Sequence, residues 1–356
     1  MAASAAAPPW LDDADLAAQK SNEAVAVAVE KCADDTKGQT CYICTEALHW
    51  KTKEGLVRMC ACRGTSGFAH VSCLAEQAKI LCAEAEENNL GPKALTERWE
   101  RWFKCSLCEQ EYHGVVACAL GWACWKTYVG RAETESVRFA AMRVLGSGLS
   151  EAQYHEAALP VKEAELAMGR RLGLPESVLL ATQSNLANTY QKFGRLESAL
   201  EMKRDVYLGC LRLNGKEHFD TLREAYNYAN ALVGLQRFEE AKSLLRKITP
   251  VARRVLGDSH DLTLRMRTIY ARASYKNPGA TLDDLREAVT MLEELERTAR
   301  RVLGGAHPTT AGIERHLGLA RAILSVREVA PTCVAIFAAV ALVAAAAVLV
   351  LRKKIQ

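Results

Sequence analysis

Several features that the sequence lacks narrow the choice of function class. The formal net charge is only +4 over 356 residues and the basic residues are scattered, so we do not expect a nucleic-acid-binding protein. The N-terminus has neither a basic start nor an apolar core of the length that a signal peptide needs, and it lacks the arginines of a transit peptide. We therefore expect the cysteines to face a reducing compartment, where clustered thiols bind metal more often than they form disulfides.

Cysteine itself is abundant and concentrated in one region. Nine of the 13 cysteines lie between Cys32 and Cys108, and most of them stand in close pairs together with one histidine. Eight sulfur and nitrogen donors can form two tetrahedral sites, so we expect two structural Zn²⁺ ions. The predicted metal ligands are Cys41, Cys44, Cys60, Cys62, His70, Cys73, Cys105 and Cys108.

The order and spacing of these ligands resemble the RING-CH zinc finger, as does the phrase CRGTSGFAHVSCL. The PHD finger shares the order of donors but usually has other spacings, and it has a tryptophan where this chain has Phe103. The RING-CH resemblance implies interleaved pairs. One zinc would be held by Cys41, Cys44, His70 and Cys73, and the other by Cys60, Cys62, Cys105 and Cys108.

The same resemblance implies an activity, which is transfer of ubiquitin from a ubiquitin-conjugating enzyme to a substrate. Both zinc ions would be structural, and no residue of this chain would act as a catalytic group. Ile43 and Trp102 would contact the conjugating enzyme, although either could instead belong to the core of the module.

Residues 137–328 carry an internal repeat. Two sets of small residues recur at the same spacings of 42, 42 and 47, namely Gly173, Gly215, Gly257 and Gly304, and Ala157, Ala199, Ala241 and Ala288. Each unit predicts a helical hairpin, and stacked hairpins form a solenoid. The turns LGDSHDLTL and LGGAHPTT resemble tetratricopeptide (TPR) repeats of the kinesin-light-chain type, which implies a peptide-binding groove lined by Asn185, Asn188, Asn227 and Asn230. The alternative is that these asparagines only make the concave face polar. The repeated His218, His260 and His307 are expected to cap helices.

The last long segment is apolar. Residues 333–351 are uncharged and long enough to cross a bilayer as a helix, which predicts a transmembrane helix over 329–352 and a basic tail over 353–356. A buried last helix of the solenoid is the alternative. The expected localisation is a membrane, tail-anchored with a cytosolic N-terminus, on the mitochondrial outer membrane, the peroxisome or the endoplasmic reticulum.

Together these features predict a mainly α-helical chain, with a small two-zinc module, an α-solenoid of about four hairpins and one transmembrane helix. The expected domains are a disordered acidic arm (1–40), the zinc module (41–113), a connecting helix (114–136), the solenoid (137–328), the membrane helix and the tail. The expected function is that of a membrane-anchored RING-CH-type ubiquitin ligase whose repeats select a protein partner. The alternative is a non-enzymatic, zinc-stabilised membrane adaptor that binds proteins through its repeats.

Overall fold

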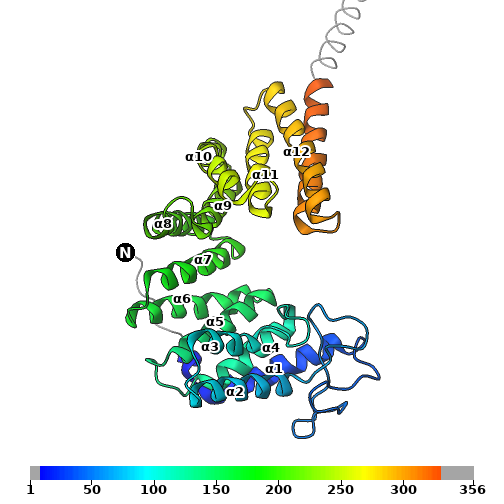
Figure 1. Cartoon of the computed structure of the whole chain (residues 1–356), viewed down its shortest axis with the longest axis vertical. Coiled ribbons are helices and arrows are strands. Elements are labelled where there is room, and N and C mark those ends of the chain that lie inside the picture. Colours follow the sequence, from blue (N-terminus) through cyan, green and yellow to red (C-terminus); the bar gives the residue numbers. More distant parts are fainter. Residues whose placement is uncertain (1–8, 330–356) are drawn as a thin grey trace, which may run out of the picture. The chain divides into compact units, whose positions relative to one another are not determined.

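The computed structural model describes residues 9–329, and within them it is almost entirely helical. The chain divides into two compact units, residues 1–199 and 200–356. In chain order the elements are η1 (Pro9–Asp12), α1 (Ala14–Cys32), α2 (Val71–Glu87), α3 (Pro92–Trp99), η2 (Glu100–Trp102), α4 (Gly114–Tyr128), α5 (Ser136–Glu151), α6 (His155–Arg171), α7 (Glu176–Lys192), α8 (Leu196–Asn214), α9 (Phe219–Gly234), α10 (Phe238–Leu256), α11 (Asp261–Lys276) and α12 (Leu282–Leu303), followed by helical residues 308–329 (Figure 1).

The first unit is organised around α4. This helix is apolar on all sides, so it is stable only where other elements cover it completely. It packs against α1, α2 and α5, and the Trp125 indole N–H donates a 2.9 Å hydrogen bond to the carbonyl of Leu11. Val57 and Phe68, from the cysteine-rich segment, belong to the same continuous core as α4. The cysteine-rich segment and the first helices of the solenoid therefore share one interior.

Two glycines let α4 and α5 approach closely. A methyl group at Gly148 would collide with the backbone of Ala117, and one at Gly121 would lie 3.1 Å from the backbone of Leu145. Larger side chains at these two positions would push the helices apart.

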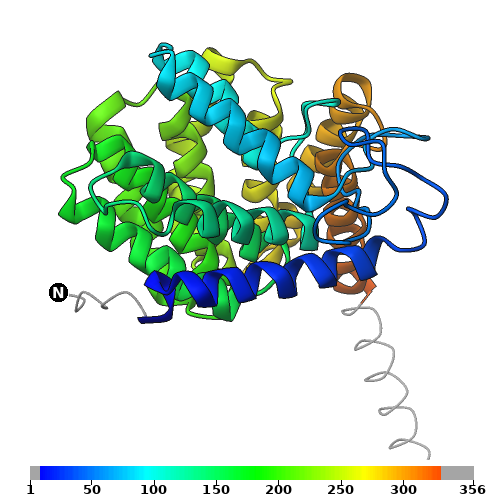
Figure 2. The same cartoon turned by 90° about the horizontal axis from the view of Figure 1, so that it is seen from below.

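The prediction of a disordered arm over residues 1–40 is wrong for residues 14–32. Residues 14–32 form α1, which lies along α4 (Figure 2). Asp13 caps the helix by accepting a hydrogen bond from the amide of Leu16 at 2.9 Å. Its buried face consists of small residues such as Ala17, Ser21 and Ala28, which bury little area each but allow close packing. An acidic, alanine-rich composition therefore concealed a packed helix.

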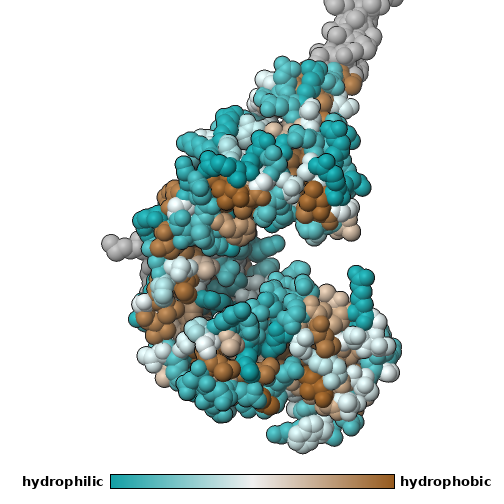
Figure 3. Space-filling view, viewed as in Figure 1, coloured by the Kyte–Doolittle hydropathy of each residue, from teal (hydrophilic) through white to brown (hydrophobic). Residues whose placement is uncertain are grey.

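The second unit consists of antiparallel helices. Neighbours in sequence from α9 to α12 pack against each other, and α9 also contacts α11, as in stacked hairpins. Leucines such as Leu222, Leu245 and Leu292 fill its core. Hydrophilic side chains cover most of the face of this unit seen in Figure 3, with small apolar patches between them.

The repeated histidines cap helices, as predicted. His218 and His260 are the N-cap residues of α9 and α11, and each ring accepts a 3.2 Å hydrogen bond from the amide two residues later. His307 does the same for the amide of Thr309.

The transmembrane helix in the predicted fold class requires correction. In residues 9–329, no helix is both long enough and apolar enough to cross a bilayer. The most apolar described helix, α4, has only 15 residues, whereas a crossing needs about 20. Residues 330–356, on which the prediction of a membrane helix and tail rested, lie outside the described residues. The localisation inferred from them stays a prediction that nothing in the structure tests.

Candidate metal centres and peptide groove

The structure brings the eight cysteine and histidine donors together in two groups of four. One group consists of Cys41, Cys44, His70 and Cys73, and the other of Cys60, Cys62, Cys105 and Cys108. Within each group the donor atoms all lie within 4.8 Å of one another. The pairs alternate along the chain between the two groups, which is the interleaved arrangement that the resemblance implied.

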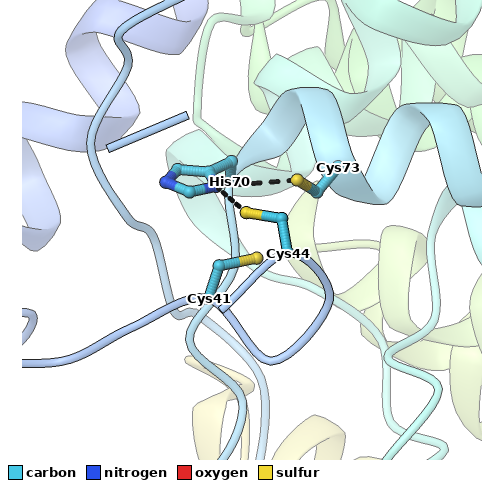
Figure 4. Close-up of side chains that lie close together, drawn as sticks. All are labelled: Cys41, Cys44, His70 and Cys73. Carbon is cyan, nitrogen blue, oxygen red and sulfur yellow. Dashed lines mark hydrogen bonds between the residues drawn. The ribbon is translucent and has the colours of Figure 1, made fainter. Parts of the chain in front are cut away.

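The donors of the first group come from two elements. Cys41 and Cys44 lie in a tight turn, while His70 is the N-cap residue of α2 and Cys73 lies in its first turn. The sulfur atoms and the Nδ1 atom of His70 face one another (Figure 4). His70 Nδ1 lies 3.4 Å from Cys44 Sγ and 3.6 Å from Cys73 Sγ.

The two Cys-x-x-Cys turns have the same backbone conformation. In each, the amide four residues after the first cysteine donates to that cysteine's carbonyl, from Thr45 to Cys41 (2.8 Å) and from Glu109 to Cys105 (3.0 Å). Thr45 and Glu109 both adopt a left-handed conformation, with φ of 65° and 56°. This costs a non-glycine residue about 1–2 kcal/mol, so the turns need an added source of stability.

Backbone amides also donate to the sulfur atoms. The amide of Ile43 lies 3.4 Å from Cys41 Sγ, and the amide of Leu107 lies 3.4 Å from Cys105 Sγ. Burial raises the pKa of the Cys41 thiol, but hydrogen bonds from backbone amides more than offset it, so this pKa is lowered overall. Such amides stabilise the thiolate, which is the form that binds a metal ion.

The environment of His70 suits a metal ligand. Its ring is buried, and this burial lowers its pKa, so the ring is neutral at pH 7. The Nε2 atom lies 3.4 Å from the carbonyl oxygen of Ala47, which leaves Nδ1 directed at the sulfur atoms. A hydrogen bond from the second ring nitrogen to a carbonyl is the usual way to orient a metal-binding histidine.

The second group depends on a glycine that the sequence analysis did not single out. Gly67 has a φ of +84°, and a side chain there would lie 2.6 Å from Cys62 Cβ and 3.4 Å from Cys60 Sγ. Only glycine lets the chain cross the Cys60–Cys62 pair this closely. Its signal in the sequence is its position in the phrase CRGTSGFAH, between that pair and His70.

The donor spacing fits the size of a zinc ion. With zinc–sulfur bonds of about 2.3 Å and zinc–nitrogen bonds of about 2.0–2.1 Å, a tetrahedron has S···S edges of about 3.8 Å and S···N edges of about 3.6 Å. Cys62 Sγ and Cys105 Sγ are 3.8 Å apart, and the two S···N distances at His70 are 3.4 and 3.6 Å. These three distances match the edges of a zinc tetrahedron, and both donor sets have the chemistry of a closed structural zinc site.

The two residues predicted to contact a conjugating enzyme differ in position. Ile43 is 36% exposed, at the tip of the first Cys-x-x-Cys turn. Leu107 occupies the matching tip of the other turn and is 52% exposed. A contact of 3.0 Å between Tyr42 OH and Ser106 Oγ joins the two turns. Leu107 is thus an exposed apolar residue that sequence reasoning missed, although its place in the second Cys-x-x-Cys pair matches that of Ile43.

Trp102 is not at the surface, and the prediction that it contacts a conjugating enzyme is wrong. The side chain is completely buried and packs against the rings of Trp99 and Tyr128, with centroid distances of 6.4 and 5.9 Å. It joins η2 to α4. The core alternative considered for this residue therefore describes it correctly.

The asparagines predicted to line a groove lie on two helices, in different units. Asn185 and Asn188 on α7 are exposed. Asn227 and Asn230 on α9 are half-buried and already bonded within the chain. The Asn227 amide donates to Glu224 Oε2 at 3.0 Å, and Asn230 Oδ1 accepts from Arg272 at 2.7 Å.

Comparison with known protein families identifies the repeats. Residues 179–220 and 225–261 match the family model for the tetratricopeptide repeat. The sequence-based prediction of TPR repeats is therefore confirmed. The matched segments cover α7 to α10, where the period of 42 residues is regular.

Solved structures resemble the chain at low identity. One is a putative kinesin light chain from Podosopora anserina with nearly identical TPR-like repeats (20% identity, 66% of this chain and 98% of that one, TM-score 0.45). Another is BtubC (BKLC) from P. vanneervenii (14% identity, 75% and 89%, TM-score 0.47). A third is a Rap protein complexed with competence and sporulation factor (14% identity, 72% and 70%, TM-score 0.40). None of the curated proteins compared matches this sequence.

Proposed function

We propose that this chain is a protein-binding scaffold whose TPR repeats hold a partner peptide, and whose N-terminal module is built around two structural zinc ions. The observation that carries the proposal is the run of helical hairpins matched as tetratricopeptide repeats. A hairpin stack offers a long concave surface, and binding is the role such surfaces commonly serve. The exposed Asn185 and Asn188 of α7 supply donors and acceptors for a peptide backbone.

Two zinc ions are part of this proposal because of the donor geometry. Cys41, Cys44, His70 and Cys73 would hold one ion, and Cys60, Cys62, Cys105 and Cys108 the other. With four protein ligands each, the ions have no open position, so they would supply folding energy and no Lewis-acid chemistry. They would also offset the cost of the two left-handed turns.

A second candidate function is docking of a ubiquitin-conjugating enzyme. It is favoured by one observation, the pair of exposed apolar tips Ile43 and Leu107 on joined turns of the module. Exposed apolar side chains on a rigid frame are typical of a protein contact. In this case the scaffold would bring a substrate to a ubiquitin-loaded partner.

Two measurements test the proposals separately. Binding of a peptide library to the full chain tests the scaffold function. We expect Asn185→Ala and Asn188→Ala to weaken peptide binding. The control is Asn88→Ala, at the C-cap of α2 and far from these residues in sequence, which should leave binding unchanged. A chain that binds no peptide would refute the scaffold function.

Autoubiquitination with a broad panel of conjugating enzymes tests the second candidate, and complete inactivity of a zinc-loaded chain would refute it.

A further inference from the structure

A groove of about 520 Å³ lies in the first unit, along one face of α4. One of its walls is α1, which contributes the stripe Leu16, Lys20, Ala24 and Val27. The end of α5 and the start of α6 form the opposite wall, and α4 is the floor. The groove is therefore a place where the neighbouring helices leave the apolar α4 partly uncovered.

The floor of the groove is apolar and uncharged. Val115, Cys118 and Trp122 line it from α4, at spacings that put them on one face of the helix, and Leu149 joins them from α5. Burial raises the pKa of the Cys118 thiol to about 12, so this side chain is neutral at pH 7. A ligand on this floor would contact hydrocarbon, sulfur and an indole ring, and a charged group would find no partner there.

The polar groups stand at the rim, and their charges cancel. Lys20 Nζ lies 2.8 Å from Glu23 Oε2, so these two side chains form an ion pair. Tyr154 is exposed on the opposite rim, and its hydroxyl has no hydrogen-bond partner among residues 9–329. The rim thus offers one free hydroxyl to a ligand but no net charge.

The groove is long and narrow. From Leu16 to Val27, α1 advances by 11 residues, which is about 16 Å at about 1.5 Å per residue. Over that length, a volume of about 520 Å³ corresponds to a mean cross-section of about 30 Å². A single aliphatic chain fits this section, whereas a partner helix with its side chains, about 10–12 Å across, is too wide.

We propose that this groove binds the aliphatic chain of a small uncharged lipid, with a hydroxyl group of the lipid at the Tyr154 side chain. Binding removes the chain and the apolar floor from water, which is favourable in proportion to the area buried. The bound chain completes the cover of α4. This site is separate from the proposed peptide groove on the repeats, and the inference does not depend on peptide binding.

Equilibrium dialysis of the full chain against straight-chain alcohols, from butanol to decanol, tests the inference. Each added methylene group should tighten binding by up to about fourfold, the effect of burying one such group. Decanoate should bind more weakly than decanol, because the Lys20–Glu23 pair leaves no net positive charge for a carboxylate. An affinity that does not depend on chain length, tighter binding of decanoate, or no binding of any alcohol would overturn the inference.

Variants that fill the groove from its two walls test the location of the site. Ala24→Phe on α1 and Ala157→Phe on α6 place a ring over the floor, and each should weaken decanol binding about 10-fold or more. The control is Ala26→Phe, at an exposed position of α1 outside the groove, which should leave decanol binding unchanged.

Two results with these variants would contradict the site. If both filled variants bind decanol as the wild type does, the chain binds elsewhere and the inference is wrong. If the wild type is a dimer that both variants dissociate, a second copy covers the groove and the inference is again wrong. The chain-length series uses only the wild type, so it decides the inference even where a filled variant fails to fold.

Discussion

Lys203 on α8 is buried at a position that the other repeats fill with an apolar residue. Only 3% of it is exposed. The equivalent residues, at spacings of 42, 42 and 47, are Val161, Leu245 and Leu292, and each is fully buried. Glu224 on α9 is the acid whose charge partly offsets the burial of this lysine. We predict that Lys203→Leu stabilises the second unit at pH 7.

The size of the effect follows from the pKa of Lys203. Burial lowers this pKa from 10.5 to about 8. Below pH 8 the lysine is charged in both the folded and the unfolded state, and the folded state bears the full cost of the buried charge. The interval from pH 8 to 10.5 corresponds to about 3 kcal/mol, at about 1.4 kcal/mol per pH unit. This stability should return as the pH rises from about 8 toward 10.5.

Glu224 remains in the variant, and the attraction that it loses is already included in the lowered pKa of Lys203. Its carboxylate still accepts hydrogen bonds from Arg223 Nε at 3.1 Å and Asn227 Nδ2 at 3.0 Å, so it is not left unbonded. We therefore expect Lys203→Leu to raise the free energy of unfolding by about 1–3 kcal/mol at pH 7. Adding Glu224→Met, which copies Met266 of the next repeat, should raise it further.

Urea unfolding of the full chain at pH 7 and at about pH 10, with hydrogen exchange in α8 and α9, measures the effect. Lys247→Leu, at an exposed position of α10, is the control and should change stability by no more than about 0.5 kcal/mol. If Lys203→Leu destabilises the protein at pH 7, or if its effect is the same at both pH values, the reasoning is wrong.

Three further predictions concern the first unit. The wild type should contain two zinc ions by elemental analysis, and Cys41→Ser or Cys60→Ser should each lose one; an unchanged zinc content in either variant would contradict the assignment. Ile43→Ala should abolish any ubiquitin transfer while both ions stay bound, because the side chain serves a partner and the thiolates serve the fold. Trp125→Phe should lower the free energy of unfolding by about 1–3 kcal/mol, since the carbonyl of Leu11 loses its donor, and a neutral result in urea unfolding would show that water replaces the indole.

The parts of the fold that could be predicted are those with a chemical or periodic signature. The close Cys and His pairs predicted that eight donors would gather in two groups of four, and the spacing of 42 residues indicates stacked hairpins without any knowledge of packing. The capping histidines could be predicted for the same reason, because they recur at turns of the repeat.

What could not be predicted depends on which surfaces meet in three dimensions. Small residues such as Ala17 and Ala28 carry little hydrophobic signal, although α4 covers them. Trp102 lies three residues before the predicted metal ligand Cys105, where a surface role is plausible, and only its packing against α4 shows that it belongs to the core.

The connection between the second Cys-x-x-Cys turn and α4 limits where this chain can be cut into folded fragments. Only residues 109–113 separate Cys108 from α4, and the amide of His113 is fixed to the carbonyl of Met59 at 2.9 Å. This hydrogen bond and the short connection restrain the Cys-x-x-Cys turn against α4, so we expect a protein bound at Ile43 and Leu107 to keep a fixed orientation relative to this helix. A fragment ending before Gly114 would leave the partner surfaces of α1 and α2 uncovered, and one starting there would uncover α4. The cysteine-rich segment and the first helices of the solenoid share one core, so we expect them to fold and unfold together.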